Sequence, residues 1–216
     1  MYQLDAAAAT KADTIGSYLQ DTGKYVGVFT RAEALVSTNK GTHGVGFTFK
    51  AEDGRETKFD IWTKKGNGEP LTGLNQMNAI MACLKVRQVN VQKMDVKKWH
   101  DGKEQIMTAD CFPDLMNKRI GLLLRSEEYA KMKDGYETGE YGWRIGLFAI
   151  FQAETELMAS EILARKTQPE QLGKVIVMLA DKPLKNKRQG GGNRQSSSGM
   201  PDSIPFDDDD MSNIPF

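Results

Sequence analysis

Alternating apolar and polar positions dominate the first third of the chain and predict β-strands. The expected strands cover residues 24–37, 43–51 and 55–63. In the second of them Val45, Phe47 and Phe49 fall on one face, as in a strand that covers a core. Short turns separate the strands, and Asp53-Gly54 is a typical hairpin sequence. This part of the chain therefore predicts an antiparallel meander of three strands.

After the meander, apolar residues no longer recur at every second position but at every third or fourth position. This spacing continues across residues 71–86, which predicts an amphipathic helix. Residues 87–116 are polar and irregular, and they indicate only short strand-like pieces. The segment that follows predicts two apolar strands, over residues 118–131 and 140–155. It then predicts two short helices, over residues 155–166 and 169–183.

The order of these elements is three strands, a helix, two strands and terminal helices. That order is typical of a five-stranded OB-fold barrel, in which a helix lies between strands three and four. We therefore expect a mainly β domain over residues 1–184, with extra C-terminal helices. Another β-barrel or an α+β sandwich stays open, because the order of elements does not determine which strands pair.

The composition changes sharply after Leu184. Residues 185–203 are rich in Gly, Ser, Asn, Gln and basic residues, so we expect a flexible linker, and residues 185–216 as a whole are expected to form a disordered acidic tail. The 29 basic and 29 acidic residues of the chain cancel, yet five acidic residues lie within residues 200–216. The body is therefore nearly neutral, and a nucleic acid could bind it only through a local groove.

Neither a signal peptide nor a membrane-spanning helix is predicted. Residues 1–10 lack a basic start and an apolar run, and no stretch approaches the roughly 20 apolar residues that cross a bilayer. Cys83 and Cys111 lack the dense spacing of a secreted disulfide scaffold. We expect a cytoplasmic protein with free thiols.

The sequence contains no convincing catalytic or metal-binding pattern. His43 and His100 are the only histidines, and the two cysteines have no zinc-ligand spacing with His100. Asp60 and Lys64 faintly resemble a nuclease carboxylate–lysine pair, but solvated charges beside a turn explain them better. A phosphate-binding loop is also missing. We expect no enzymatic activity, cofactor or metal.

Aromatic and basic residues along the strands predict a surface for single-stranded nucleic acid. Such a surface needs rings that stack on bases and cations that follow the phosphates. Trp62 is the strongest candidate ring, because Lys58 and Asp60 share its side of the strand and basic residues follow it. The phenylalanines of the second and third strands, with Phe148 and Phe151, are expected in the core instead. The predicted DNA-contacting residues are Tyr25, Phe29, Arg31, Lys50, Trp62, Lys64, Lys65, Trp99, Arg119, Arg125, Trp143 and Arg144.

The chain closes on "IPFDDDDMSNIPF", which places four aspartates between two copies of Ile-Pro-Phe. An acidic run alone is usually a solubilising feature, but an apolar tripeptide at the chain end suggests burial by a partner. The aspartates would add long-range attraction to a basic partner surface. The predicted partner-binding residues are Asp207, Asp208, Asp209, Asp210, Ile214, Pro215 and Phe216.

This ending resembles that of bacterial single-stranded DNA-binding proteins, which close on acidic residues followed by Ile-Pro-Phe. The resemblance implies an OB domain that binds single-stranded DNA and a tip that docks replication, recombination and repair enzymes. Two departures stand out: residues 211–213 separate the aspartates from the final tripeptide, and residues 204–206 duplicate it. Residues 73–86 and 159–166 are similar to the divergent versions of bacteriophages and prophages.

We therefore expect a sequence-independent single-stranded DNA-binding protein that protects transient single strands and recruits partner enzymes in a bacterial cytoplasm. An adaptor that recruits host repair enzymes through its tail and binds another protein, not DNA, with its body is the main alternative, and the near-neutral body keeps it open. A strand-annealing protein is a further alternative. Whether the chain forms a homo-oligomer stays open.

Overall fold

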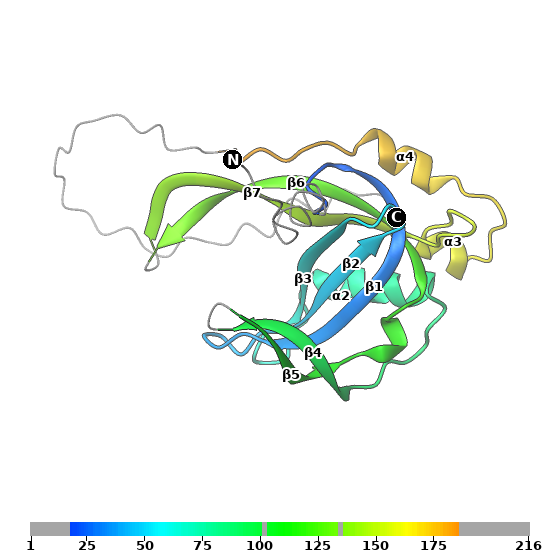
Figure 1. Ribbon diagram of the computed structural model, residues 1–216. Helices are drawn as coiled ribbons and strands as arrows, with labels where there is room; N and C mark the ends of the chain where they lie inside the picture. Colours follow the sequence, from blue (N-terminus) through cyan, green and yellow to red (C-terminus); the bar gives the residue numbers. More distant parts are fainter. Residues whose placement is uncertain (1–17, 101–102, 134–135, 186–216) are drawn as a thin grey trace, which may run out of the picture.

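The computed structural model describes residues 18–100, 103–133 and 136–185 (Figure 1). Antiparallel strands dominate the described chain, and helices are few and short. In chain order the elements are β1 (Gly23–Val36), β2 (His43–Ala51), β3 (Glu56–Lys64), α2 (Gly73–Cys83), β4 (Gln92–His100), β5 (Lys103–Cys111), the 3-10 helix η1 (Pro113–Leu115), β6 (Arg119–Lys133), β7 (Tyr136–Phe151), α3 (Ala159–Leu163) and α4 (Gln171–Val177).

β1 is the central strand of the sheet and pairs with two sets of neighbours. Its first part, from Gly23 to Val28, pairs with β6, and most of its length pairs with β2, which continues into β3. The β1–β2 register shifts between Phe29 and Arg31. Such a bulge bends a strand and increases its twist, which allows β1 to leave β6 while it stays paired with β2. The expected three-stranded meander with a long first strand is confirmed.

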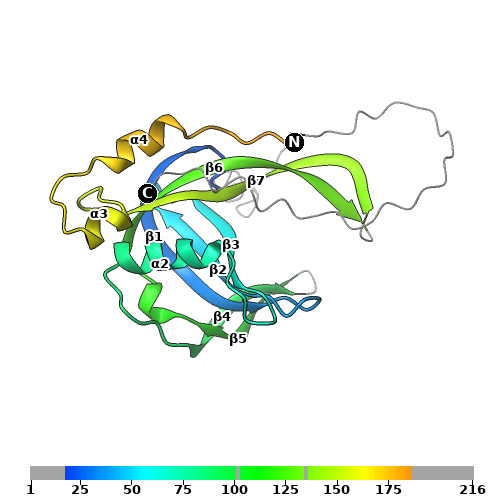
Figure 2. The same cartoon turned by 180° about the vertical axis from the view of Figure 1, so that it is seen from behind.

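The expected mainly β domain is confirmed, but the described sheet has seven strands and is not closed, so a five-stranded OB-fold barrel is not confirmed. β6 pairs with β1 and β7, while β3 and β7 form no ladder with each other among the described residues. The β6–β7 hairpin projects well beyond the rest of the described chain as a curved arm (Figures 1 and 2). The arm is long because the two strands stay paired from Gly121 with Phe151 out to Lys133 with Tyr136.

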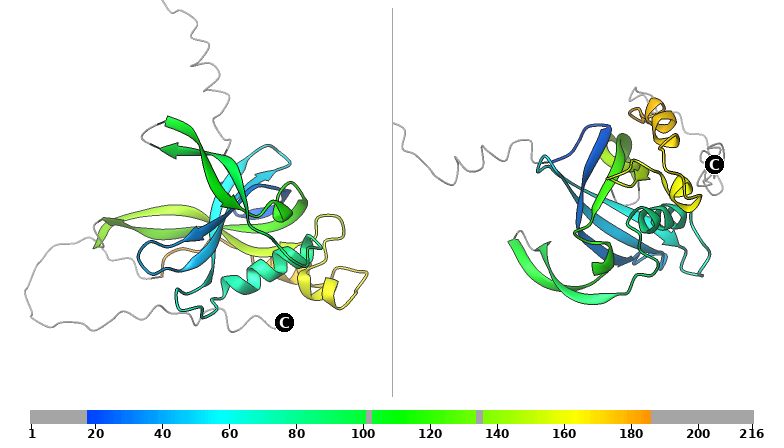
Figure 3. Two further views of the ribbon diagram at one scale, coloured as in Figure 1. Left: turned by 90° about the horizontal axis from the view of Figure 1, so that it is seen from below. Right: turned by 90° about the vertical axis from the view of Figure 1, so that its right-hand side faces the viewer.

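The interpretation of residues 87–116 as irregular is wrong, because most of this segment forms the nine-residue strands β4 and β5. They pair along their whole length and reach β1 at one point, where Glu33 lies opposite Cys111. Val96, Ala109 and Cys111 form a small buried cluster under the hairpin. Most other side chains of the hairpin are polar, which hid the strand signal in the sequence. Seen from below, this hairpin and the β6–β7 arm diverge from the meander (Figure 3).

Phenylalanine rings from the meander form the centre of the core. The ring centroids of Phe29 and Phe47 lie 4.5 Å apart, and those of Phe47 and Phe59 lie 5.7 Å apart. The expected core positions of the β2 and β3 phenylalanines are confirmed, as is that of Phe151. α2 covers this core with Met77, Ile80 and Cys83 (Figure 2).

The segment from α3 to Lys185 wraps back onto β6. Glu161 of α3 is 1% exposed and accepts backbone hydrogen bonds from Met158, Glu170 and Gln171, which fixes the loop between α3 and α4. After α4 the backbone N–H of Lys182 donates to the carbonyl of Ser126, which forms an isolated bridge along β6. The two predicted C-terminal helices are confirmed, although both are shorter than their sequence pattern.

The remaining expectations concern the acidic tip, the two cysteines, membrane-spanning helices and metal sites. The acidic tip, residues 207–216, lies outside the described residues. Cys83 and Cys111 are free and buried, and burial raises the pKa of the Cys83 thiol to about 12. No helix of the described chain combines the length and the apolar character needed to cross a bilayer. The same residues contain no group of three or more His, Cys, Asp or Glu side chains able to hold a metal ion.

Candidate nucleic-acid interface

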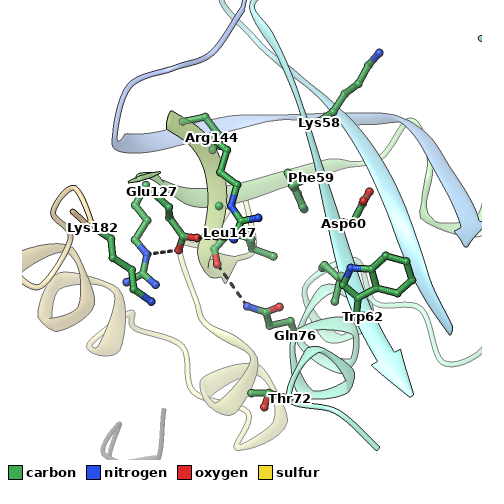
Figure 4. A pocket seen from close by; sticks show the side chains of 14 residues that line it. Lys58, Phe59, Asp60, Trp62, Thr72, Gln76, Glu127, Arg144, Leu147 and Lys182 are labelled. Carbon is green, nitrogen blue, oxygen red and sulfur yellow. Dashed lines mark hydrogen bonds and ion pairs between the residues drawn. The ribbon is translucent and has the colours of Figure 1, made fainter. Parts of the chain in front are cut away.

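A groove of about 620 Å³ opens between β3 and β7 (Figure 4). Its walls come from β3, from the start of α2, and from β6 and β7, with Lys182 added by the segment after α4. Because β3 and β7 form no ladder in the described sheet, the groove lies at the open seam between these two strands. We call this cavity, lined among others by Trp62 and Arg144, the β3–β7 groove.

Basic side chains outnumber acidic ones in the β3–β7 groove. They are Lys58, Arg125, Arg144 and Lys182, against Asp60 and Glu127. The Nε of Arg125 donates to Glu127 Oε1 at 2.8 Å, and Nη2 of Arg144 lies 3.7 Å from Oε2 of the same carboxylate. Glu127 thus holds both guanidinium groups on one wall. The remaining positive excess favours an anionic ligand.

The two arginines differ in how free they are. The Arg125 side chain is 20% exposed and its guanidinium also lies 5.0 Å from the ring centroid of Phe148. The Arg144 side chain is 67% exposed. Lys58 and Lys182 form no ion pair with another described residue. Arg144 and the two lysines are therefore the cations best able to contact a phosphate.

Trp62 lines the groove, and its ring leans over a glycine of the neighbouring strand β2. Gly44 of β2 pairs with Trp62 of β3, and a Cβ built at Gly44 would lie 2.8 Å from Cε3 of the indole. The six-membered ring therefore rests against the β2 backbone, in space that any other residue would fill. Trp62 keeps 37% of its surface exposed, which leaves ring area for stacking.

Tyr129 repeats this arrangement at the start of the arm, and the sequence did not indicate it. Tyr129 of β6 pairs with Gly142 of β7, and a Cβ at Gly142 would lie 2.9 Å from Cζ of the phenol. The guanidinium of Arg144 lies 5.8 Å from the same ring centroid. Residues two apart on a strand share a face, so Tyr129 continues the face of Glu127 outward from the groove. Tyr129 is 38% exposed.

Arg31 lies on the same outer face as Lys58 but is engaged elsewhere. The register places Arg31, Thr48 and Lys58 in one row across β1, β2 and β3. Nη1 of Arg31 donates to the backbone carbonyl of Lys97 at 3.2 Å, and its Nε lies 3.6 Å from Glu33, which is also paired with Lys98. Arg31 therefore ties the β4–β5 hairpin to β1.

Asp60 and Glu33 occupy the adjacent row, with Gly46 between them. Partial desolvation raises the pKa of the Asp60 carboxyl, the charge of Glu33 raises it further, and Arg31 opposes both. Asp60 is exposed in the groove and makes no hydrogen bond or ion pair with another described residue. It is therefore an open acceptor beside Trp62 (Figure 4).

Several predicted DNA-contacting residues lie outside the groove. Phe29 is fully buried, so its ring is not accessible to a base, and the expectation for it is corrected. Tyr25 is half-buried; its hydroxyl donates to the Asp21 carbonyl at 3.0 Å, and its ring lies 5.5 Å from the Arg55 guanidinium. Both residues lie in β1 and are absent from the groove lining. Packing within the meander explains both positions.

The outlying cations are exposed, and most are paired with carboxylates. Lys50 lies 3.8 Å from Glu56, Lys65 lies 3.1 Å from Glu69, and Arg119 lies 2.6 Å from Glu52. Lys64 is exposed at the end of β3. None of these four lines the β3–β7 groove.

Of the two remaining tryptophans, Trp143 lies outside the groove lining. Trp143 pairs with Glu128, whereas Arg144 pairs with Glu127. Neighbouring strand residues point to opposite faces, so Trp143, which is 53% exposed, lies on the face of the arm away from the groove. Trp99 belongs to β4, and its side chain lies outside the described features. The structure thus brings together Trp62, Arg125 and Arg144 from the predicted set.

A second, apolar cavity of about 300 Å³ adjoins the groove. Phe148, Ile150, Met158 and Val175 contribute to its lining, between α2, β7, α3 and α4. Thr72 and Gln76 line both cavities, and Nε2 of Gln76 donates to the Leu147 carbonyl at 3.4 Å. The first turns of α2 therefore separate a polar groove from an apolar one.

Known proteins add no assignment to this geometry. A comparison with protein-family models and a comparison with curated proteins each find no significant match for the chain.

Proposed function

We propose that the protein binds single-stranded DNA in the β3–β7 groove and performs no chemistry on it. The observation that supports this most is the exposed Trp62 ring, which rests on the β2 backbone within a groove of net positive charge. Stacking on a ring is tolerant of sequence because every base has a π face, while cations follow the backbone. Tyr129 would extend the track onto the arm.

We further propose that β1, β2, β3, β6 and β7 are an OB-type sheet, with the β4–β5 hairpin as an insertion. If the hairpin is set aside, α2 lies between the third and fourth strands, and β1 pairs with both β2 and β6. OB-folds are partly open five-stranded barrels that bind oligonucleotides on the face of strands two and three. An open seam beside β3 is compatible with that arrangement.

The cellular role that we propose rests on the resemblance of the chain end. In this proposal the body covers transient single strands during replication, recombination or repair in a bacterial cytoplasm, for a phage or prophage. Residues 207–216 recruit partner enzymes: Phe216 enters a partner's pocket while the aspartates add long-range attraction.

The apolar cavity beside the groove favours a second candidate, in which the body binds a protein segment. Its lining by Phe148, Ile150 and Met158 would accept an apolar side chain. In that case the protein would be an adaptor, and its groove would not prefer a nucleic acid.

DNA titration of the full-length protein separates the two functions. We expect a fluorescently labelled oligothymidylate to bind with an occluded length between about 4 and 16 nucleotides per domain. The log–log dependence of affinity on salt should have a slope of about −0.7 for each phosphate contacted. Equal affinity for duplex and single-stranded DNA, or a salt slope near zero, would overturn the proposed DNA-binding function. The adaptor function would then be the remaining candidate.

A further inference from the structure

The β3–β7 groove contains one acidic side chain that its proposed role as a phosphate track does not explain. Glu127 is neutralised by Arg125 and Arg144, but Asp60 is exposed in the groove without a hydrogen bond or ion pair to another described residue. A free carboxylate repels phosphates and weakens binding of a nucleic-acid backbone. Asp60 therefore suits a different part of the ligand.

The position of Asp60 relative to Trp62 indicates which part that is. The two residues lie two apart on β3, so their side chains share the groove face, about 6.6 Å apart along the strand. Gly46 lies opposite Asp60, just as Gly44 lies opposite Trp62. The β2 side of this face carries no side chain at either position. Oδ1 of Asp60 lies 3.1 Å from where a Cβ of Gly46 would be, and Leu35 lies beside it, so the carboxylate leans over β2 as the Trp62 ring does. A planar group stacked on Trp62 would therefore have the Asp60 carboxylate beside its edge.

The surroundings of the Asp60 carboxylate favour a ligand that donates a hydrogen bond to it. Partial desolvation raises the pKa of Asp60, and the nearby Glu33 carboxylate raises it further. An acceptor that has lost part of its water gains more from a hydrogen bond than a fully solvated one. A ligand that supplies N–H groups at this place would be preferred over one that supplies oxygen atoms.

An unpaired guanine supplies two such donors side by side. Its N1–H and its 2-amino group point the same way and match the two oxygens of a carboxylate, whereas cytosine and adenine place a ring acceptor beside their amino group. Thymine flanks its single N3–H with two carbonyl oxygens, which a carboxylate repels. We propose that Asp60 accepts hydrogen bonds from the Watson–Crick edge of a guanine stacked on Trp62, which gives the groove one guanine-preferring position.

This inference rests on the proposed DNA-binding function and adds a base preference to it. Its test uses the full-length protein and oligothymidylate 15-mers in which the central base alone is changed, so that no guanine-rich structure can form. A central guanine should bind about fivefold or more tightly than thymine, the lower end for a contact of two hydrogen bonds. Hypoxanthine, which lacks the 2-amino group, should lose most of the gain, and 7-deazaguanine should keep it.

Substitution of Asp60 identifies the residue responsible. Asp60→Asn keeps the size of the side chain but loses the charged pair of acceptors, so the ratio of guanine to hypoxanthine affinity should fall toward one. Affinity for plain oligothymidylate should rise slightly, because a negative charge leaves the groove. Asp110→Asn, which removes an exposed carboxylate from β5, is the matched control and should leave the ratio unchanged.

The outcomes separate the two levels of the proposal. Failure of the wild-type protein to bind any of these oligonucleotides would overturn the DNA-binding function itself. Equal affinity for guanine, hypoxanthine and thymine would leave that function standing and overturn the role of Asp60. So would a guanine preference that survives Asp60→Asn, because another residue would then read the base.

Discussion

The indole of Trp62 lies against Gly44 of the neighbouring strand, where a Cβ would approach Cε3 to 2.8 Å. This contact supports one side of the ring and leaves 37% of the residue exposed. A tryptophan so placed is rigid, because β2 backbone lies beneath it. Rigid rings lose little entropy when a base stacks on them. The pair is therefore a prepared stacking surface within the proposed interface.

Trp62→Ala should weaken single-stranded DNA binding by roughly 1–3 kcal/mol, the contribution of one stacked base. The melting temperature should fall less than for a fully buried tryptophan, because 37% of the residue is already exposed. Trp143→Ala is the matched control on the opposite face of the arm and should have a smaller effect on affinity. DNA titration and thermal unfolding of both variants make the comparison. A stability loss of about 3–5 kcal/mol for Trp62→Ala, typical of a buried tryptophan, would contradict the stacking role.

Arg144→Gln should reduce both the affinity for single-stranded DNA and its salt dependence. Its exposed guanidinium faces the groove, and loss of one phosphate contact should make the log–log salt slope shallower by about 0.7. Arg119→Gln removes a cation that is also exposed but lies outside the groove, paired with Glu52 and Glu154. DNA titrations across a salt series should show a shallower log–log slope for Arg144→Gln and an unchanged slope for Arg119→Gln. Similar slopes for both variants would argue against a phosphate contact in the β3–β7 groove.

Two glycine substitutions should change stability in opposite directions. A Cβ at Gly121 would lie 2.1–2.4 Å from three ring atoms of Phe151, which is fully buried, so Gly121→Ala should destabilise by about 1–3 kcal/mol through overpacking. Gly173 lies inside α4, and no atom outside its own helix backbone and chain neighbours lies within 4 Å of its Cβ position. Gly173→Ala should stabilise by roughly 0.5–1 kcal/mol. Denaturant unfolding measures both, and a destabilised Gly173→Ala would show that α4 needs the glycine.

The Glu161 carboxylate should make stability fall at acid pH. Burial by itself raises its pKa, but three backbone N–H donors, with Lys166 nearby, outweigh burial and hold the pKa below its ordinary value of 4.5. A group with a lowered folded-state pKa stabilises fully above its ordinary pKa and loses that effect as pH falls through the folded value.

Glu161→Gln should therefore destabilise at pH 7, by about 1–3 kcal/mol for donors left unsatisfied. Its deficit relative to the wild type should shrink as pH falls below about 4.5. Unfolding midpoints across this range measure the difference; a deficit that does not change with pH would show that the charge of Glu161 is unimportant.

Deletion of residues 214–216 should abolish binding to replication and repair enzymes and leave DNA affinity unchanged. In the proposed function the tripeptide would be the buried anchor, whereas the groove would make the DNA contacts. Further deletion of residues 207–210 should tighten DNA binding slightly at low salt, because the aspartates would compete with phosphates for the proposed DNA groove.

Phe216→Ala should have a larger effect on partner binding than Phe206→Ala, because residues 214–216 follow the aspartates, as the tripeptide does in the ending that they resemble, whereas residues 204–206 precede them. Pull-down with identification of the retained proteins tests this order. If Phe216→Ala changes no interaction, the resemblance of the chain end is coincidental.

The sequence by itself determined the elements whose residues interact with near neighbours. Alternation in β2 placed Phe47 and Phe49 in the core, and the apolar spacing of α2 predicted the face that buries Met77 and Ile80. These features depend on local periodicity, because side chains alternate in a strand and recur every three to four residues in a helix.

Pairing between distant segments was decided only by the tertiary structure. The glycines opposite Trp62 and Tyr129 depend on register, which no local pattern shows. Lys182 reaches the groove only because the segment after α4 returns along β6. Adjacent strand residues such as Trp143 and Arg144 must point to opposite faces of the sheet. Which of the two faces lines a groove depends on the elements that pack against the strand. Long-range packing, and not composition, therefore turned scattered rings and cations into one candidate site.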